Sequence, residues 1–217
     1  MHKKLSLGLS LGFYGNLTFV IFALVCYIYY KSFDPASGFS KVLEVCAYLC
    51  LFGGFAMLAA ADVLIIITTR MRKLLKTVFS LYIVMEAAMM YCELNSFKVL
   101  SFYDPYSVWL AIIHSVLSAA VCFCFLDLDR YKHPFESTVI ICIGIILGGM
   151  FGTILNIRIY FGILANAISF TILFAMIRSM LNRNIIEIDC HGDSARVAEY
   201  KGVFETEPDT GNNSDNK

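Results

Sequence analysis

The sequence predicts an all-α polytopic membrane protein, a bundle of six transmembrane helices with both termini in the cytoplasm. Hydrophobic residues make up 59% of the 217 residues and charged residues only 16%, whereas a soluble domain usually carries about a quarter charged residues. The mean hydropathy is +0.71, so the chain has too little polar surface to cover a water-soluble core. Lysine plus arginine and aspartate plus glutamate both number 17, and this balance excludes a basic nucleic-acid-binding protein.

Several apolar stretches are long enough to cross a bilayer, since a helix needs about 20 apolar residues for a hydrocarbon layer of about 30 Å. We expect the first to be retained rather than cleaved as a signal peptide, because its apolar run exceeds the roughly 7–15 residues of such a segment. Polar breaks such as Asp104-Pro105 separate the stretches, because proline cannot extend a helix. The predicted spans are residues 9–30, 45–69, 77–97, 106–126, 137–157 and 159–177.

The boundary between the last two spans is the least sharply marked. Residues 137–181 are nearly continuous in their apolar character and would extend about 67 Å as one helix, at about 1.5 Å per residue. That length exceeds a single crossing. We therefore place a reversal at Asn156-Ile157-Arg158, the strongly polar cluster within the run. A turn displaced by a few residues is the alternative.

Positive charge in the loops predicts the orientation, because lysine and arginine accumulate on the cytoplasmic side. With six spans, one side of the membrane holds ten of these residues and the other holds four. The side with ten lysines and arginines also holds both termini, which we therefore expect in the cytoplasm. A cell or plasma membrane is the favoured location. The ten are Lys3, Lys4, Arg70, Arg72, Lys73, Lys76, Arg130, Lys132, Arg178 and Arg183, and the four are Lys31, Lys41, Lys98 and Arg158.

Two regions are expected along the chain, a transmembrane domain over residues 1–184 and an acidic, flexible cytoplasmic tail over residues 185–217. The tail holds eight acidic residues against three basic ones. An acidic and weakly apolar segment buries too little surface to offset its ordering entropy. We interpret it as a solubilising terminus, and a partner-binding role is the alternative.

Small residues predict how the helices pack, since helices in lipid associate through close approach of their backbones. In the fifth span Gly144, Gly148 and Gly152 recur every four residues and therefore share one helical face. We expect this face to pack in the bundle core, and homodimerisation through the fifth helix is the competing use. Shorter sets of small residues lie in the first span (Gly8, Gly12) and in the second (Gly53, Gly54).

Ionisable and amide side chains within the spans are functional candidates, because a charged group at the centre of a bilayer costs about 2.5–3.5 kcal/mol even on the milder insertion scales. In the predicted topology they fall between the middle of the bilayer and its outer face. We therefore expect one polar pocket open to the outside, with Tyr103, Tyr106 and Trp109 at its rim. Separate hydrogen bonds to backbone carbonyls are the alternative. The candidate ligand- or ion-binding residues are Glu86, Glu93, His114, Arg158 and Asn166.

Asp62 is a further candidate and stands apart, in the cytoplasmic half of the second span. It lies about 12 Å along the helix from Arg70, by the rise per residue, which is too far for an easy salt bridge. An ion or proton site is one interpretation. A structural hydrogen bond to a neighbouring helix is the other.

No motif in the sequence predicts a cofactor, a metal or a catalytic site. The eight cysteines include no Cys-x-x-Cys pair and the four histidines are scattered, so the spacing of zinc or haem ligands does not occur. Motifs of phosphate loops, nucleophile elbows and zinc helices do not occur either. We expect a protein that is not an enzyme, and an intramembrane enzyme using Asp62 or Glu86 with His114 is the alternative.

These features favour a multi-pass membrane protein that binds or transports a small polar solute, an ion or a proton through the outward-facing pocket. The expected partners are membrane lipids and a small-molecule or ionic ligand, with no nucleic acid. A homo-oligomer or a partner membrane subunit is also considered. The second hypothesis is a membrane-embedded sensor or assembly subunit that acts through its cytoplasmic tail.

Overall fold

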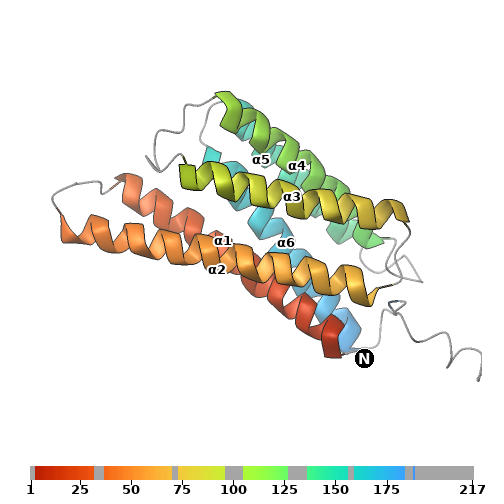
Figure 1. Cartoon of the computed structure of the whole chain (residues 1–217). Coiled ribbons are helices and arrows are strands. Elements are labelled where there is room, and N and C mark those ends of the chain that lie inside the picture. The colour runs from red at the N-terminus through yellow and green to blue at the C-terminus, as the bar shows by residue number, and fades with distance from the viewer. Residues whose placement is uncertain are drawn as a thin grey trace, which may run out of the picture.

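The computed structural model describes residues 3–31, 37–69, 73–95, 105–126, 136–155 and 159–183, together with Ile188. Within these ranges it contains six helices and no strand, which confirms the predicted all-α class (Figure 1). The helices are α1 (Lys3–Lys31), α2 (Gly38–Thr68), α3 (Lys73–Asn95), α4 (Pro105–Leu126), α5 (Glu136–Ile154) and α6 (Ile159–Asn182).

Each helix overlaps one predicted span, and the expected reversal falls between the end of α5 at Ile154 and the start of α6 at Ile159. Within the described part of the chain, five helices, α1, α2, α4, α5 and α6, are long and apolar enough to cross a membrane. The 23 residues of α3 include two lysines and two glutamates, which lowers its apolar character. The structure thus supports a multi-pass membrane protein, while six crossings and the location of the termini stay predictions.

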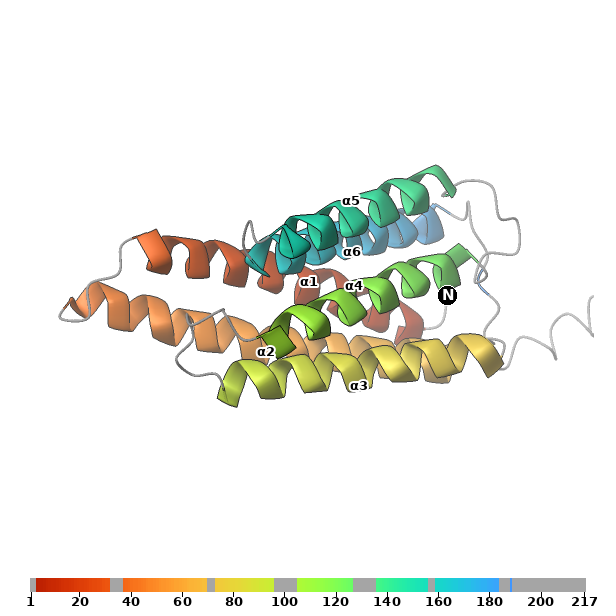
Figure 2. The ribbon, with the colours of Figure 1, turned by 90° about the horizontal axis from the view of Figure 1, so that it is seen from above.

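The helices form a ring in chain order, in which each packs against its sequence neighbours and α6 returns to α1. α6 also contacts α4, and α5 lies at the edge of the bundle beside this pair (Figure 2). The most extensive contact joins α1 to α2, whereas α2 and α3 touch least among the sequence neighbours. The ring therefore consists of an α1–α2 hairpin attached to the other four helices mainly through α1 and α6.

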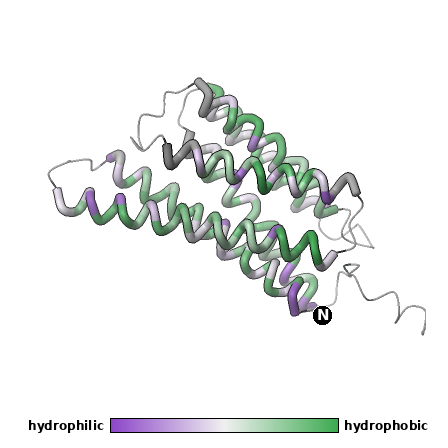
Figure 3. The backbone as a smooth tube through the Cα atoms, in the orientation of Figure 1, coloured by the Kyte–Doolittle hydropathy of each residue, from purple (hydrophilic) through white to green (hydrophobic). Residues whose placement is uncertain are grey.

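Apolar side chains cover the outward surface of this ring. Figure 3 shows hydrophobic residues along the length of the helices, and many of the large ones are exposed. A soluble monomer rarely exposes an apolar patch larger than a few hundred Å², so a surface of this kind fits a lipid environment. Large exposed side chains include Leu49, Val84, Ile140, Phe151 and Leu155.

The main packed core lies toward the end of the bundle that holds the N-terminus (Figure 1). Its buried residues come from the start of α1, the end of α2, the start of α3 and the ends of α4 and α6, with α5 alongside; they include Leu9, Ile65, Phe79, Phe125 and Leu173. A second, smaller cluster consists of Phe22, Cys26, Ala47 and Leu51, in the other halves of α1 and α2. The cavity described below lies between these two clusters.

Glycines in α1 and α2 permit the close helix contacts that the sequence predicts. A Cβ atom at Gly12 would lie 2.5 Å from the ring of Phe174 on α6. One at Gly54 would lie 2.9 Å from the ring of Phe19 on α1. A larger residue at either position would have to displace an aromatic ring, so these glycines set the distances between α1, α2 and α6.

The glycine stripe on α5 does not pack inside the bundle, contrary to expectation. Cβ atoms at Gly144, Gly148 and Gly152 would meet no described atom within 4 Å, and the same holds for Gly53 in α2. α5 is apolar on all sides, so its composition does not specify which face turns inward. Association of this stripe with a second copy stays a prediction. The residues that α5 buries instead are Val139, Cys142, Ile146 and Thr153.

Ile188 is the single described residue of the predicted tail. It is buried and belongs to the main core at the N-terminal end of the bundle. At this position, therefore, the chain beyond α6 still packs against the helices. The rest of residues 185–217 lies outside the described part of the chain, and their flexibility stays a prediction.

Candidate functional site

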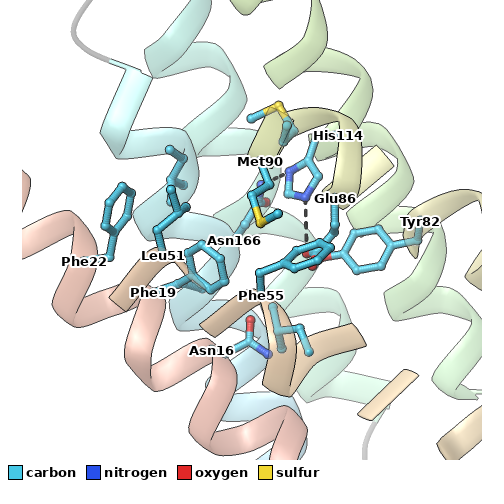
Figure 4. Close-up of a pocket in the computed structure, with 14 residues that line it drawn as sticks. Asn16, Phe19, Phe22, Leu51, Phe55, Tyr82, Glu86, Met90, His114 and Asn166 are labelled. Carbon is cyan, nitrogen blue, oxygen red and sulfur yellow. Dashed lines mark hydrogen bonds and ion pairs between the residues drawn. The ribbon is translucent and has the colours of Figure 1, made fainter. Parts of the chain in front are cut away.

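A cavity lies between the α1–α2 hairpin and helices α3, α4 and α6 (Figure 4). Its volume of about 60 Å³ exceeds the roughly 10–15 Å³ that one water molecule needs. Its walls are more apolar than the pocket that the sequence predicts. The described lining residues are Asn16, Phe19, Phe22, Leu51, Phe55, Leu58, Tyr82, Glu86, Met89, Met90, His114, Ile163, Asn166 and Ala167.

Glu86 of α3 and His114 of α4 form the polar centre of this cavity. The carboxylate oxygen Oε1 of Glu86 lies 3.6 Å from Nε2 of His114, and the two side chains are only 10% and 13% exposed. A carboxylate buried this deeply is costly unless a polar group faces it. The pairing offsets part of that cost and links two neighbouring helices (Figure 4).

Asn166 of α6 extends the chain of polar groups. Its side-chain nitrogen Nδ2 lies 3.1 Å from Nδ1 of His114. An amide nitrogen can only donate, so Nδ1 accepts in this arrangement, while Nε2 of the same ring faces Glu86. The Asn166 residue is 6% exposed, and its oxygen Oδ1 has no hydrogen-bond partner among the described residues.

Tyr82 of α3 contacts both Glu86 and His114. Its ring stacks on the imidazole of His114 with a centroid distance of 5.4 Å and an interplanar angle of 24°. Its hydroxyl also interacts with the carboxyl group of Glu86. The sequence analysis assigned Tyr82 no role. The available signal was its position four residues before Glu86, which puts both side chains on one helical face.

Aromatic rings close the cavity toward the N-terminal end of the bundle. Tyr82 contacts Phe170 at a centroid distance of 5.7 Å, and Phe170 is followed by Phe174 at 6.4 Å. The series continues to Phe125 at 5.4 Å and from there to Phe79 at 5.5 Å. All five residues are buried. This run of packed rings, drawn from α3, α4 and α6, forms an apolar floor beneath the polar groups.

Asn16 of α1 is a cavity residue that the sequence analysis did not propose as one. Its Nδ2 donates a hydrogen bond of 2.8 Å to the backbone carbonyl of Gly12, one turn earlier in the same helix. That bond uses one of its two N–H donors, and the side-chain oxygen is turned toward the cavity (Figure 4). The amide in the middle of an apolar span was the available signal.

Asp62 lies near the cavity without lining it. It is buried on α2 and interacts electrostatically with Glu86. Its interpretation as an isolated residue is therefore too narrow, because the fold places two carboxyl groups from α2 and α3 in one region of the bundle.

The structure does not place the other predicted site residues at the cavity. The side chain of Glu93, the whole of Arg158 and the proposed rim residues Tyr103 and Tyr106 lie outside the described side chains. The third rim residue, Trp109, is 66% exposed and does not line the cavity. The predicted convergence therefore holds for Glu86, His114 and Asn166.

Metal binding and relationships to known proteins offer no further guide. Among the described residues there is no group of three or more histidine, cysteine, aspartate or glutamate side chains that could hold a metal ion. The sequence matches no known protein family, and no curated protein or solved structure is significantly similar to it. The site is therefore interpreted from its own chemistry.

Proposed function

We propose that this protein crosses the membrane six times, with both termini in the cytoplasm, and binds a small solute in the cavity around Glu86 for movement across the membrane. Five apolar helices support insertion. The remaining helix, α3, contacts both α2 and α4, and its 23 residues extend about 34 Å, enough to cross beside them. In this topology the crossing that is least apolar supplies the carboxylate of the cavity.

The convergence of Glu86, His114 and Asn166 from three helices is the observation that carries this proposal. Polar groups in lipid are expensive to maintain, and many satisfy themselves within one helix, as Ser10 and Thr18 do through bonds of 2.8 Å to carbonyls one turn earlier. The three cavity residues instead meet across the bundle. A mainly apolar cavity with a few convergent polar groups is typical of small-molecule sites.

The aromatic floor supports access to this cavity from outside the cell. The floor lies toward the end of the bundle that holds the N-terminus, which the distribution of lysine and arginine assigns to the cytoplasm. A solute bound at Glu86 would thus be separated from the cytoplasm by the rings of Phe170, Phe174 and Phe125. Movement across the membrane requires that these rings separate.

Binding is tested with the full chain in lipid nanodiscs, by equilibrium dialysis against three radiolabelled probes of similar size: phenethylamine, phenethyl alcohol and hydrocinnamate. The proposal predicts saturable binding of at least one of them. Ala167 lines the cavity and is buried, so Ala167→Leu should fill the cavity and abolish binding. Ala175→Leu, at an exposed position on the same helix, should leave binding unchanged.

Two results would contradict this proposal: no saturable binding of any probe, or full binding by the Ala167→Leu variant. Uptake of the bound probe into proteoliposomes then tests movement across the membrane. Binding without uptake would instead assign the cavity to a sensor.

A further inference from the structure

We propose that the solute is an organic cation, a protonated amine on a short apolar body. This inference rests on the proposed function and names the chemical class that the cavity accepts. It draws on three independent properties of the site: the sign of its charge, the hydrogen-bonding type of its free polar atoms, and the nature of its walls.

The charge of the cavity is negative. Glu86 faces it directly, and the buried carboxyl group of Asp62 interacts with Glu86. Among the described lining residues there is no lysine or arginine. A cationic ligand would supply the positive charge that balances Glu86.

The free polar atoms of the cavity include hydrogen-bond acceptors. The Oδ1 atom of the nearly buried Asn166 has no partner among the described residues. One of the two N–H donors of Asn16 is bonded to the carbonyl of Gly12, and its oxygen is turned toward the cavity. Glu86 faces His114, and a carboxylate has several lone pairs. A protonated primary amine carries three N–H donors and no acceptor, which matches this set.

The walls suit the apolar body of such an amine. The side chains of Phe19, Phe22 and Phe55 line the cavity on the side of the α1–α2 hairpin (Figure 4). Aromatic faces attract ammonium ions as well as apolar groups. Met89 and Met90 of α3 complete the wall, and methionine adapts readily to ligands of different shape. An anion would meet the carboxyl group of Glu86, and a neutral alcohol would leave the charge of Glu86 unbalanced.

The order of affinities among the three probes tests this inference. Phenethylamine is expected to bind at least about tenfold more tightly than phenethyl alcohol, and hydrocinnamate the least. In Glu86→Gln the affinity for the amine should fall about tenfold, whereas the affinity for the alcohol should not change. Retained alcohol binding also shows that the variant folds. Glu44→Gln, at an exposed position on α2, is the matched control and should keep the preference for the amine.

The possible results separate this inference from the proposed function. Binding of the alcohol or the carboxylate as tight as that of the amine would overturn the cationic class and leave ligand binding intact. An unchanged preference for the amine in Glu86→Gln would also overturn it. Binding of none of the probes would overturn both proposals. The order of probe affinities for the unmodified chain tests the cationic class even where the Glu86→Gln variant does not fold.

Discussion

The side-chain nitrogen of Asn166 lies 3.1 Å from Nδ1 of His114, although 52 positions separate the two residues in the sequence. This contact joins α6 to α4 at the cavity and orients the imidazole so that its other nitrogen faces Glu86. The same geometry leaves Oδ1 of Asn166 buried without a described partner. An acceptor maintained at such cost points to a ligand that supplies the missing donor.

His114→Ala is expected to destabilise the protein more than Asn166→Ala. Removing the imidazole leaves Glu86 without its facing group and removes the stacking on Tyr82, so the free energy of unfolding should fall by about 1–3 kcal/mol. Asn166→Ala exchanges one unpaired acceptor, Oδ1, for another, Nδ1 of His114. The free energy of unfolding of the Asn166→Ala variant should therefore fall by less than about 1 kcal/mol.

Unfolding in mixed detergent micelles measures both losses, with Ile113→Ala as the control. Ile113 precedes His114 on the same helix and is exposed. If Asn166→Ala proves as costly as His114→Ala, the amide oxygen is paired in the folded protein, and the assignment of the site as an acceptor-rich cavity fails.

Gly12→Ala is expected to loosen the packing of α1 on α6. The added Cβ would lie 2.5 Å from Phe174, whose ring also packs against Phe125 and Phe170 and so has little freedom to move. Overpacking of this kind costs about 1–3 kcal/mol. Gly148→Ala on α5, whose Cβ meets no described atom within 4 Å, should be neutral or slightly stabilising. A thermal unfolding series of the two variants checks this, and equal midpoints would show that α1 and α6 lie farther apart than described.

Ser169→Ala is expected to weaken the contact between α5 and α6 only slightly. The hydroxyl of Ser169 donates to the carbonyl of Cys142 at 3.1 Å, and the thiol of Cys142 donates to the carbonyl of Ser169 at 3.3 Å. Hydrogen bonds between membrane helices contribute about 0.6 kcal/mol on average. The unfolding free energy should fall by roughly that amount, against no change in the exposed Ser179→Ala control. A loss of several kcal/mol would mean that this pair does more than join two helices.

Reporter fusions at both ends of the chain test the predicted topology. Six crossings place a fluorescent protein at either terminus in the cytoplasm and leave a periplasmic or lumenal phosphatase inactive at both. Five crossings, with α3 outside the membrane, would place the two termini on opposite sides. That result would contradict the assignment of α3, and with it of Glu86, to the bilayer.

Much of the fold follows from the sequence because its main signals are long apolar runs and turn residues. The break before α6 and the glycine contacts of α1 and α2 are of this kind. The depth of Glu86, His114 and Asn166 follows from position along each helix, and the structure brings these residues together. Whether they bind a ligand stays a proposal.

Rotation of each helix about its own axis is the property that the sequence does not encode here. A helix that is apolar on all sides has no hydrophobic face to direct inward. For this reason the stripe at Gly144, Gly148 and Gly152 was expected inside the bundle, and the structure turns it outward. The aromatic floor and the role of Tyr82 depend on the same rotations, so they appear only in three dimensions.

A ligand with a heavy-atom label gives the most direct test of the central claim that Glu86, His114 and Asn166 face one ligand cavity. The full chain is crystallised in a lipidic phase with para-bromophenethylamine, and the bromine is located by anomalous scattering. We expect the bromine among the aromatic side chains Phe19, Phe22 and Phe55, with the ammonium group directed to Glu86 and to Oδ1 of Asn166. An anomalous peak elsewhere on the protein, with the cavity unchanged and Asn166 bonded to another side chain, would contradict the account.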